Sequence, residues 1–470
     1  MKVSGIEIKG LSTDSRLIKP GYLFGAQDSE KAPASAYIPS AVQNGAAVIV
    51  CKPEYADTKA YPQVTFVTDD NPNKAFARLA AAFYGPQPEN IAAITGTNGK
   101  TSIADFVRQI LTRMDIKAAS MGTLGLIKGN EAPIPSPNTT PNAAVIAEEL
   151  ADLKKEGYDY VIMETSSHGL CQYRTGGVQN VKVAGFTNLT RDHLDYHKTF
   201  ENYLAAKEIL FREVLVGGGT AVLNADIEVY PHLRKVCEDS GKKVITYGRN
   251  GSELKLLSAV PTLDGQQLRL VFYGKETEIF VPLAGEFQAM NVLCALGMAA
   301  ELTGKLNDVL QHISHIRGAK GRLDLVGKTA GGAAVYVDYA HTPDALENVI
   351  RAMRSHCRGK LHVLFGCGGD RDAGKRPIMG KIANELADVI YVTDDNPRTE
   401  DAEKIRMQIM AACPRGKNIG NRAEAIKTAI AGLGQDDILI IAGKGHENGQ
   451  YINGQIFHFS DYEEVCKNLK

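Results

Sequence analysis

The hydrophobic and polar positions of this chain alternate between short apolar runs and stripes of helical spacing. The run from Ile91 to Ile94 predicts a buried strand. Downstream, apolar residues recur every three or four positions, as on one face of an amphipathic helix: Ile103, Phe106, Val107, Ile110 and Leu111. The polar stretch 95–102 lies between the two and contains two glycines. The pattern therefore predicts a strand, a tight turn and a helix.

Similar patterns recur along the whole sequence. Strands are predicted at 46–50, 64–68, 160–163 and 183–187, a hairpin at 268–272 and 278–281, and helices at 73–84 and about 289–302. Four later β-runs end at Asp338, Gly366, Asp394 and Gly443, with helical stretches between them. This alternation predicts an α/β fold with a doubly wound, mostly parallel sheet at the end of the chain. We expect three domains, at 1–86, 87–317 and 318–470.

Composition excludes several classes of partner. The 470 residues are 44% hydrophobic and 23% charged, as in globular proteins. The net charge of -1 gives no electrostatic reason to expect nucleic acid or an anionic membrane. No apolar run approaches about 18 residues, and the N-terminus Met1–Gly5 lacks the hydrophobic region of a signal peptide. The eight cysteines form no C-x-x-C pair, so we expect reduced thiols in a cytoplasmic protein.

The turn Gly96-Thr97-Asn98-Gly99-Lys100-Thr101 predicts a phosphate-binding loop. Its glycines permit a tight turn, and the N-terminus of the following helix favours an anion. Lys100 would reach the β- and γ-phosphates, and the Thr101 hydroxyl would bind Mg²⁺. Ile94 stands where the strict pattern has its first glycine, so the alternative is a turn that binds nothing. The strand and helix on either side favour nucleotide binding.

Polar residues in the middle of the chain extend this prediction. Glu164 ends a β-run and would hold Mg²⁺ opposite Thr101; the alternative is a carboxylate that caps a helix. His193 and His197 have a spacing that suits zinc, but the glutamate of H-E-x-x-H and a third ligand are missing. We expect one histidine near Mg²⁺ and the phosphates, and the other in a structural role. From the residues alone, Lys207 is interpreted as a solvated helix lysine.

Three polar turns follow β-runs of the last domain: 366–372, 394–398 and 443–447. The carboxyl ends of parallel strands meet at one edge, where α/β sheets bind ligands. Arg371 and Arg398 would each bind a carboxylate through two N–H groups, and Glu447 would bind an ammonium. The turns therefore predict a site for a zwitterionic, polycarboxylate small molecule. Surface salt bridges are the alternative.

Taken together, these motifs resemble the Mur ligase family of peptidoglycan precursor synthesis over essentially the whole chain. The matching stretches are 96–101, Met163-Glu164 with 166–168, Asn188-Leu189 with 192–195, 338–343, 368–372 and 443–447. The resemblance implies a three-domain architecture with a central P-loop mononucleotide-binding domain and a C-terminal Rossmann-like domain. It also implies an ATP- and Mg²⁺-dependent ligase that joins an amino acid to a carboxylate through an acyl phosphate.

The resemblance assigns residues to five sets. The catalytic set is Lys100, Lys207, Glu164 and His193. The metal set is Thr101, Glu164, His193 and Lys207, the last as a carbamylated lysine. The ATP set is Gly96, Thr97, Asn98, Gly99, Lys100, Thr101, Asn291, Arg322, Asp338 and His341. The nucleotide-sugar set is Ser15, Thr139, Thr140, Ser166, Gln172 and Arg174. The amino-acid set is Arg371, Asp395, Asn396, Pro397, Arg398, Gly443 and Glu447.

Within the family, Asn396-Pro397-Arg398 resembles the selecting turn of members that add meso-2,6-diaminopimelate to UDP-MurNAc-L-Ala-D-Glu. Diaminopimelate differs from lysine by a distal carboxylate, which suits a guanidinium; lysine would leave that guanidinium unpaired. The resemblance further implies a cytoplasmic monomer with small-molecule partners only. The chain departs from the family at 27–33, which lacks a Gly and a Gly-His pair, and at Gln288, where relatives have Asn.

Two other functions remain open at this point. A ligase that resembles folylpolyglutamate synthase would share the loop and the acyl-phosphate chemistry, but it has no obvious need for both Arg371 and Arg398. A nucleotide-binding regulatory module would need no ligase activity at all. The complete set of Lys100, Glu164, Lys207 and Glu447 argues against that module.

Overall fold

The structure is a computed structural model that describes residues 1–28, 32–262 and 265–469. The chain forms two compact units, which we describe separately. The first contains Met1–Tyr247 and Cys294–Val309, and the second contains Gly248–Leu293 and Leu310–Lys470. The three domain ranges given above remain a prediction. Of the departure at 27–33, residues 29–31 lie outside the described residues.

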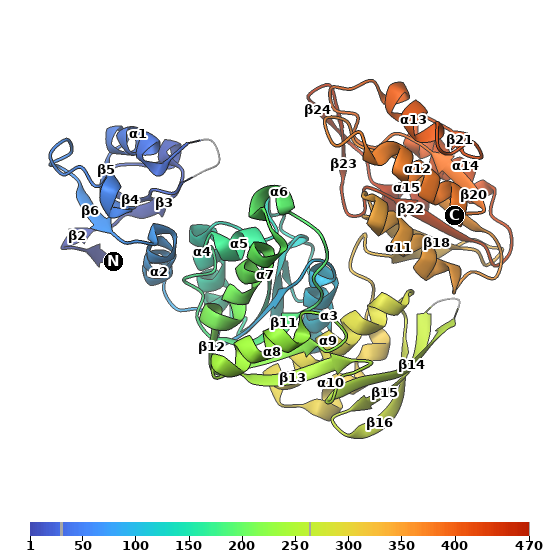
Figure 1. The fold of residues 1–470 in the computed structure, drawn as a ribbon, viewed down its shortest axis with the longest axis horizontal. Coiled ribbons are helices and arrows are strands. Elements are labelled where there is room, and N and C mark those ends of the chain that lie inside the picture. The colour runs from blue at the N-terminus through green and yellow to red at the C-terminus, as the bar shows by residue number, and fades with distance from the viewer. Residues whose placement is uncertain (29–31, 263–264, 470) are drawn as a thin grey trace. The chain divides into compact units, whose positions relative to one another are not determined.

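The N-terminal part of the first unit is a small parallel sheet with helices (blue in Figure 1). Its strand order is β3 (Gly10–Ser12), β4 (Tyr22–Gly25), β5 (Ala46–Cys51) and β6 (Thr65–Thr68), and β1 (Lys2–Val3) pairs with β2 (Ile6–Glu7). The helices are η1 (Ser15–Leu17), η2 (Ala34–Tyr37), α1 (Ile38–Gln43), η3 (Pro53–Tyr55) and α2 (Pro72–Tyr84). Asn71 caps the start of α2, and Gly85 ends it with a φ of 105°. These elements confirm the strands and the helix predicted before residue 86.

The rest of the first unit contains a larger, mainly parallel sheet. Its strands, in spatial order, are β13 (Lys243–Gly248), β12 (Leu215–Asn224), β11 (Val181–Phe186), β7 (Asn90–Thr95), β10 (Tyr160–Glu164), β8 (Ala118–Gly122) and the antiparallel β9 (Gly125–Lys128). The helices are α3 (Lys100–Arg113), α4 (Ala143–Lys155), α5 (Ser167–Cys171), α6 (Leu194–His197), α7 (Phe200–Ile209), η4 (Leu210–Val214) and α8 (Tyr230–Asp239). Because β7 lies between β10 and β11, Glu164 at the end of β10 and Asn188 just after β11 lie at the ends of the two strands that flank β7, which leads into the predicted phosphate loop.

The second unit begins with the antiparallel strands β14 (Leu254–Thr262), β15 (Gly265–Phe272) and β16 (Lys275–Val281), which contain the predicted hairpin. The helices α9 (Glu286–Thr303) and α10 (Leu306–Gln311) each contribute residues to both units, and η5 (Ile313–His315) follows. The sheet order after this is β17 (Asp324–Lys328), β18 (Ala334–Asp338), β22 (Ile438–Ala442), β19 (Leu361–Phe365), β20 (Val389–Val392) and β21 (Lys417–Asn418). Only β17 is antiparallel to its neighbour.

Helices cover both faces of this second sheet. Side chains of α11 (Pro343–Arg354), α12 (Lys375–Leu386) and α13 (Ala402–Met410) pack in one hydrophobic cluster. Side chains of α14 (Arg422–Ala431) and α15 (Asp461–Asn468) pack in another. Along β18, Tyr336 belongs to the first cluster, whereas Val335 and Val337 belong to the second. The doubly wound sheet is therefore confirmed, and its four polar strand ends lie at one edge.

Candidate active site

The phosphate loop is shaped by its two glycines. Gly96 has a φ of 140° and Gly99 a φ of 88°, values that side-chain-bearing residues rarely adopt. A Cβ on Gly96 would lie 1.8 Å from the Thr187 hydroxyl oxygen. Helix α3 starts immediately afterwards at Lys100. The predicted strand, loop and helix are confirmed. At Gly96 the loop approaches Thr187 too closely to accept a residue larger than glycine.

Residues that follow β11 hold the loop in place. The Asn98 backbone N–H donates to Asn188 Oδ1 at 2.9 Å, and the Thr187 hydroxyl donates to the Asn98 carbonyl at 2.6 Å. The Thr97 N–H donates to the Asn188 carbonyl at 2.9 Å. These bonds fix the loop to the segment that follows β11.

Two lysines converge on this loop. Lys100 Nζ donates to the carbonyls of Gly96 and Thr97, at 2.9 and 2.8 Å. Lys207 Nζ donates to the same Gly96 carbonyl at 2.8 Å, and only 1% of Lys207 is exposed. Burial lowers the pKa of Lys207 well below its usual value, and the Lys100 ammonium lowers it further. The interpretation of Lys207 as a solvated lysine was wrong, because α7 places this side chain against the loop.

Glu164 lies on the other side of the loop, at the end of β10, and is 3% exposed. Its Oε2 accepts the Thr101 hydroxyl at 2.8 Å, and its Oε1 accepts the Thr123 backbone N–H at 2.8 Å. A Cβ on Gly122 would lie 2.1 Å from Glu164 Oε1. Thr101 and Glu164 thus present a hydroxyl and a carboxylate oxygen side by side, which are ligands that fit Mg²⁺.

The two histidines of the 188–197 stretch have different surroundings. His197 is 6% exposed, and its Nε2 lies 3.0 Å from the Ser167 hydroxyl. His193 is exposed, with its ring centroid 4.7 Å from that of His168 and its Nε2 3.3 Å from an Asp192 carboxylate oxygen. His193 is therefore the one that a ligand can approach. Its predicted role beside the metal remains a prediction.

Five of the six predicted nucleotide-sugar residues form one connected group next to Glu164. The Thr140 hydroxyl donates to the Glu164 carbonyl at 3.0 Å and accepts the Ser166 N–H at 2.9 Å. Arg174 donates to the Thr140 carbonyl and to the Gln172 side chain. Thr139 belongs to the same group, because its hydroxyl lies 3.0 Å from that of Thr123.

Ser15 is the exception among the predicted nucleotide-sugar residues. It lies in the small N-terminal sheet region, where its carbonyl accepts the Asn44 side-chain amide at 2.9 Å. It is 8% exposed. The bond thus joins Ser15 to a residue of its own sheet region.

The ATP residues predicted at 291–341 lie in the second unit and form a chain of contacts. Asn291 donates to the Gln288 side chain at 2.9 Å, and Gln288 donates to the Arg322 carbonyl at 3.5 Å. The Arg322 guanidinium lies 4.6 Å from the ring centroid of Tyr339. The departure at Gln288 therefore keeps Asn291 oriented, because its longer side chain reaches both partners.

Asp338 is the next residue of the predicted ATP set, and it lies close enough to Arg322 to be affected by its charge. Its carboxylate accepts the backbone N–H groups of Leu323 and Ala340 at 2.6 and 2.7 Å. Burial raises the pKa of Asp338 despite the opposing effect of Arg322. The His341 side chain is exposed, and its Nδ1 lies 2.8 Å from the Tyr339 carbonyl.

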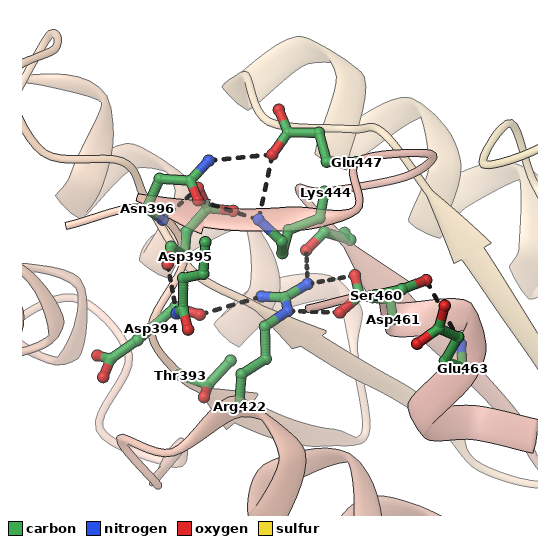
Figure 2. A network of polar contacts seen from close by, with 12 residues as sticks. Thr393, Asp394, Asp395, Asn396, Arg422, Lys444, Glu447, Ser460, Asp461 and Glu463 are labelled. Carbon is green, nitrogen blue, oxygen red and sulfur yellow. Dashed lines mark hydrogen bonds and ion pairs between the residues drawn. The ribbon is translucent and has the colours of Figure 1, made fainter. Parts of the chain in front are cut away.

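The three polar turns of the last sheet meet as predicted, and side chains connect two of them directly (Figure 2). Asn396 Nδ2 donates to Glu447 Oε2 at 3.0 Å. Asp395 Oδ1 accepts the Asn396 N–H at 2.7 Å, and a Cβ on Gly443 would lie 2.8 Å from Asp395 Oδ2. Gly443 has a φ of 117°, so this position requires glycine for both space and conformation.

Arg398 is held by its backbone in a conformation that arginine rarely adopts, with a φ of 54°. Its N–H donates to the Tyr451 carbonyl at 2.9 Å, and its own carbonyl accepts the Asn453 N–H at 2.7 Å. Both partners belong to the hairpin of β23 (Gly449–Ile452) and β24 (Gln455–His458). The Arg398 guanidinium donates to the Gly369 carbonyl at 2.8 Å. Arg371 is exposed in the same turn region as Gly369.

Comparison with known proteins identifies the family to which this chain belongs. Three family profiles match: "Mur ligase family, catalytic domain" at residues 7–84, "Mur ligase middle domain" at 94–299, and "Mur ligase, glutamate ligase domain" at 321–445. The chain belongs to the Mur ligase family.

Among its relatives, a protein of Caulobacter vibrioides is 44% identical over 468 residues, 98% of this chain and 96% of the relative. One of Bradyrhizobium diazoefficiens is 43% identical over 471 residues, 99% and 96% of the two chains. Both are named UDP-N-acetylmuramoyl-L-alanyl-D-glutamate–2,6-diaminopimelate ligase. A solved structure of a protein of that name superposes with a TM-score of 0.74 at 32% identity, covering 99% of this chain and 97% of that one.

A folylpolyglutamate synthase of Mycobacterium tuberculosis, solved with ADP, shares the fold of this Mur ligase. Its TM-score is 0.62 at 20% identity, over 79% of this chain and 91% of that one. Within the residues that the structure describes, no helix is long and apolar enough to cross a membrane. In the same residues, no three His, Cys, Asp or Glu side chains are grouped so that they could hold a metal ion. A Mg²⁺ ion here would take its other ligands from phosphates and water.

Sequence reasoning missed three polar groups of this Mur ligase. Thr123 binds both oxygens of Glu164, but it lies in a turn without a recognisable motif. Arg422 and Asp461 form an ion pair that is fully buried beneath the amino-acid turns, with bonds of 2.7 and 2.8 Å. Lys444 is also fully buried, within the stretch 443–447 that was singled out. Its position between Gly443 and Glu447 was the one feature of the sequence that could have indicated a role in this site.

Proposed function

We propose that this Mur ligase joins meso-2,6-diaminopimelate to UDP-MurNAc-L-Ala-D-Glu and converts ATP to ADP and phosphate. The observation that carries the choice of amino acid is the contact between Asn396 and Glu447, at the sheet edge where Arg398 binds the neighbouring turn at Gly369. A guanidinium and a carboxylate at one edge suit a substrate that has both an ammonium and a distal carboxylate. The names of relatives that are 42–45% identical over nearly the whole chain support the same choice.

The chemistry follows from the low reactivity of a carboxylate towards an amine in water. The D-glutamyl side-chain carboxylate attacks the ATP γ-phosphorus, and the bond from that phosphorus to the bridging oxygen of ADP breaks. The resulting acyl phosphate is attacked by an amine of diaminopimelate, which loses a proton, and phosphate leaves from the tetrahedral intermediate. The protein's task is to position these groups and to neutralise negative charge.

Residues around the loop are suited to this task. The loop N–H groups and Lys100 bind the phosphates, and Thr101 and Glu164 hold Mg²⁺, which neutralises charge on the phosphate oxygens when bound. The connected group of Thr139, Thr140, Ser166, Gln172 and Arg174 binds the nucleotide-sugar peptide. In the second unit, Asn291, Arg322, Asp338 and His341 bind the rest of ATP.

The carbamylation of Lys207 is also part of the proposal. A carbamate forms when a neutral amine attacks CO₂ and loses a proton, so a lysine must first be uncharged. Burial and the Lys100 ammonium favour the neutral form of Lys207. The product is an anion, which can act as a further oxygen ligand of Mg²⁺. Growth of a carbamate signal in the ¹³C NMR spectrum after addition of ¹³C-bicarbonate, and its absence in Lys207→Met, would support it.

The experiment that tests the function measures phosphate release with each substrate omitted in turn. We expect release only when ATP, Mg²⁺, UDP-MurNAc-L-Ala-D-Glu and diaminopimelate are all present, with a UDP-MurNAc-tripeptide as the second product. ATP hydrolysis that is indifferent to the amino acid would favour a regulatory module. Ligation of glutamate to a folate instead would favour the folylpolyglutamate synthase alternative.

A further inference from the structure

Lys444 lies where three segments of the amino-acid site meet. It follows the end of β22, and its exposed fraction is 0%. Its Nζ donates to Asn396 Oδ1 at 3.0 Å, to Glu447 Oε2 at 3.1 Å and to the Gly449 carbonyl at 2.6 Å. These partners belong to the selecting turn, the loop after β22 and the first residue of the β23–β24 hairpin. Figure 2 shows the ammonium between Asn396 and Glu447.

The geometry uses the whole hydrogen-bonding capacity of Lys444. An ammonium has three N–H donors, and here three oxygens accept them. A fully buried cation is costly unless it is paired and hydrogen-bonded, as it is by the Glu447 carboxylate and two neutral oxygens. No donor is left for a substrate, so Lys444 does not bind one itself.

The same bonds determine which way Asn396 and Glu447 face. Because Asn396 Oδ1 also accepts the Tyr451 N–H at 3.2 Å, its Nδ2 is turned towards Glu447 Oε2. Glu447 Oε2 therefore receives two donors, whereas the structure gives Oε1 no hydrogen bond within the described part of the chain. The Glu447 side chain is 31% exposed. One carboxylate oxygen is thus fixed and the other faces outwards.

We infer that Lys444 is a positioning residue for the amino-acid substrate. It fixes Glu447 Oε2 and the Asn396 amide so that Glu447 Oε1 can bind the substrate ammonium. Through its bond to the Gly449 carbonyl, it also holds the β23–β24 hairpin next to these two side chains. This inference rests on the proposed function, because it assigns the Asn396 and Glu447 side chains to amino-acid binding. A displacement of either group would weaken binding of the amino acid and leave the other two substrates unaffected.

The test compares steady-state constants of the full-length wild type with those of Lys444→Met, Glu447→Gln and the double variant. We expect Lys444→Met to raise the KM for diaminopimelate by about 10- to 100-fold, with the KM values for ATP and for UDP-MurNAc-L-Ala-D-Glu unchanged. The double variant should lose less than the sum of the losses of the two single variants, because Lys444 acts in part through Glu447. Equal losses for all three substrates, or additive effects in the double variant, would overturn the inference.

A matched control separates this role from general stability. Lys242 Nζ donates to the carbonyls of Leu215 and Val216, at 2.7 and 3.0 Å, away from the sites described above. Lys242→Met should lower the melting temperature without changing any KM. If Lys444→Met does not fold, Lys444→Gln, which keeps an N–H donor, is measured against the same expectations. A wild type that makes no amide from diaminopimelate would refute the proposed function. An active wild type whose Lys444 variant changes the KM values of all three substrates alike would refute only this inference.

Discussion

At the scale of single residues, the proposed chemistry depends on two lysines that donate to the same backbone carbonyl. Lys100 and Lys207 both donate to Gly96, but their burial differs. Lys207 is 1% exposed, whereas Lys100 is half-buried at the start of α3. Lys100 is therefore the lysine that phosphates can reach, whereas burial lowers the pKa of Lys207 and favours its neutral form. The two residues allow separate predictions.

Lys100→Ala should abolish turnover and leave the protein folded. The variant removes the cation that neutralises the transferred phosphoryl group, and we expect kcat to fall by at least about 1,000-fold. Its bonds in the structure go to carbonyls of its own loop, so the melting temperature should change little. Lys155→Ala, which removes an exposed lysine paired with Asp152, is the control and should keep full activity. Retained turnover in Lys100→Ala would contradict the assignment of the loop.

Lys207→Met should make the protein more stable at pH 7 in CO₂-free buffer. The folded state lowers the pKa of Lys207 well below 10.5, so between that lowered pKa and 10.5 the unfolded chain binds more protons at this residue than the folded protein does. Stability therefore rises with pH between the lowered pKa and about 10.5, where the penalty disappears. The gain in melting temperature from Lys207→Met should shrink as the pH approaches 10.5. A constant difference, or a loss of stability at pH 7, would contradict the neutral lysine.

At the scale of elements, the phosphate loop is fixed by close approach between backbone and side chains. Gly96→Ala would place a Cβ 1.8 Å from the Thr187 hydroxyl at a φ of 140°. We expect a loss of about 2–5 kcal/mol in stability and of ATP binding, because both strain and a clash are introduced. Calorimetry with ADP and thermal melting would measure the two effects.

The chain offers a matched glycine for this comparison. A Cβ on Gly217, in β12, would meet no atom within 4 Å. Gly217→Ala should therefore keep nucleotide affinity and melting temperature close to those of the wild type. Equal effects of the two substitutions would show that the close approach at Gly96 is unimportant.

The strands and helices could largely be predicted from the sequence, whereas the contacts between distant segments could not. Apolar runs such as 91–94 and polar strand ends such as Glu164 were predictable, because parallel strands bury both faces and place ligands at one edge. The burial of Lys207 was not predictable from its local pattern, because it depends on α7 packing against a loop 111 positions away. The role of Lys444 required the meeting of three segments that are separate in sequence.

At the scale of the whole molecule, the proposed reaction requires groups from both units. The phosphate loop belongs to the first unit, whereas Asn291, Arg322 and the amino-acid turns belong to the second. An amine and an acyl phosphate must approach to bonding distance, so we expect ligands to favour a more closed arrangement. Small-angle scattering should give a smaller radius of gyration with ATP analogue and both other substrates than without them. Identical profiles would count against closure.

The most direct test of the account is the ratio of kcat/KM for meso-diaminopimelate to kcat/KM for L-lysine. We predict that the wild type ligates diaminopimelate and that its kcat/KM for lysine is at least about 100-fold lower, because lysine leaves the guanidinium unpaired. Arg398→Lys, which loses the forked donor, should reduce that ratio by about tenfold or more. A wild type that prefers lysine, or a ratio that Arg398→Lys does not change, would contradict the proposed selection of the distal carboxylate.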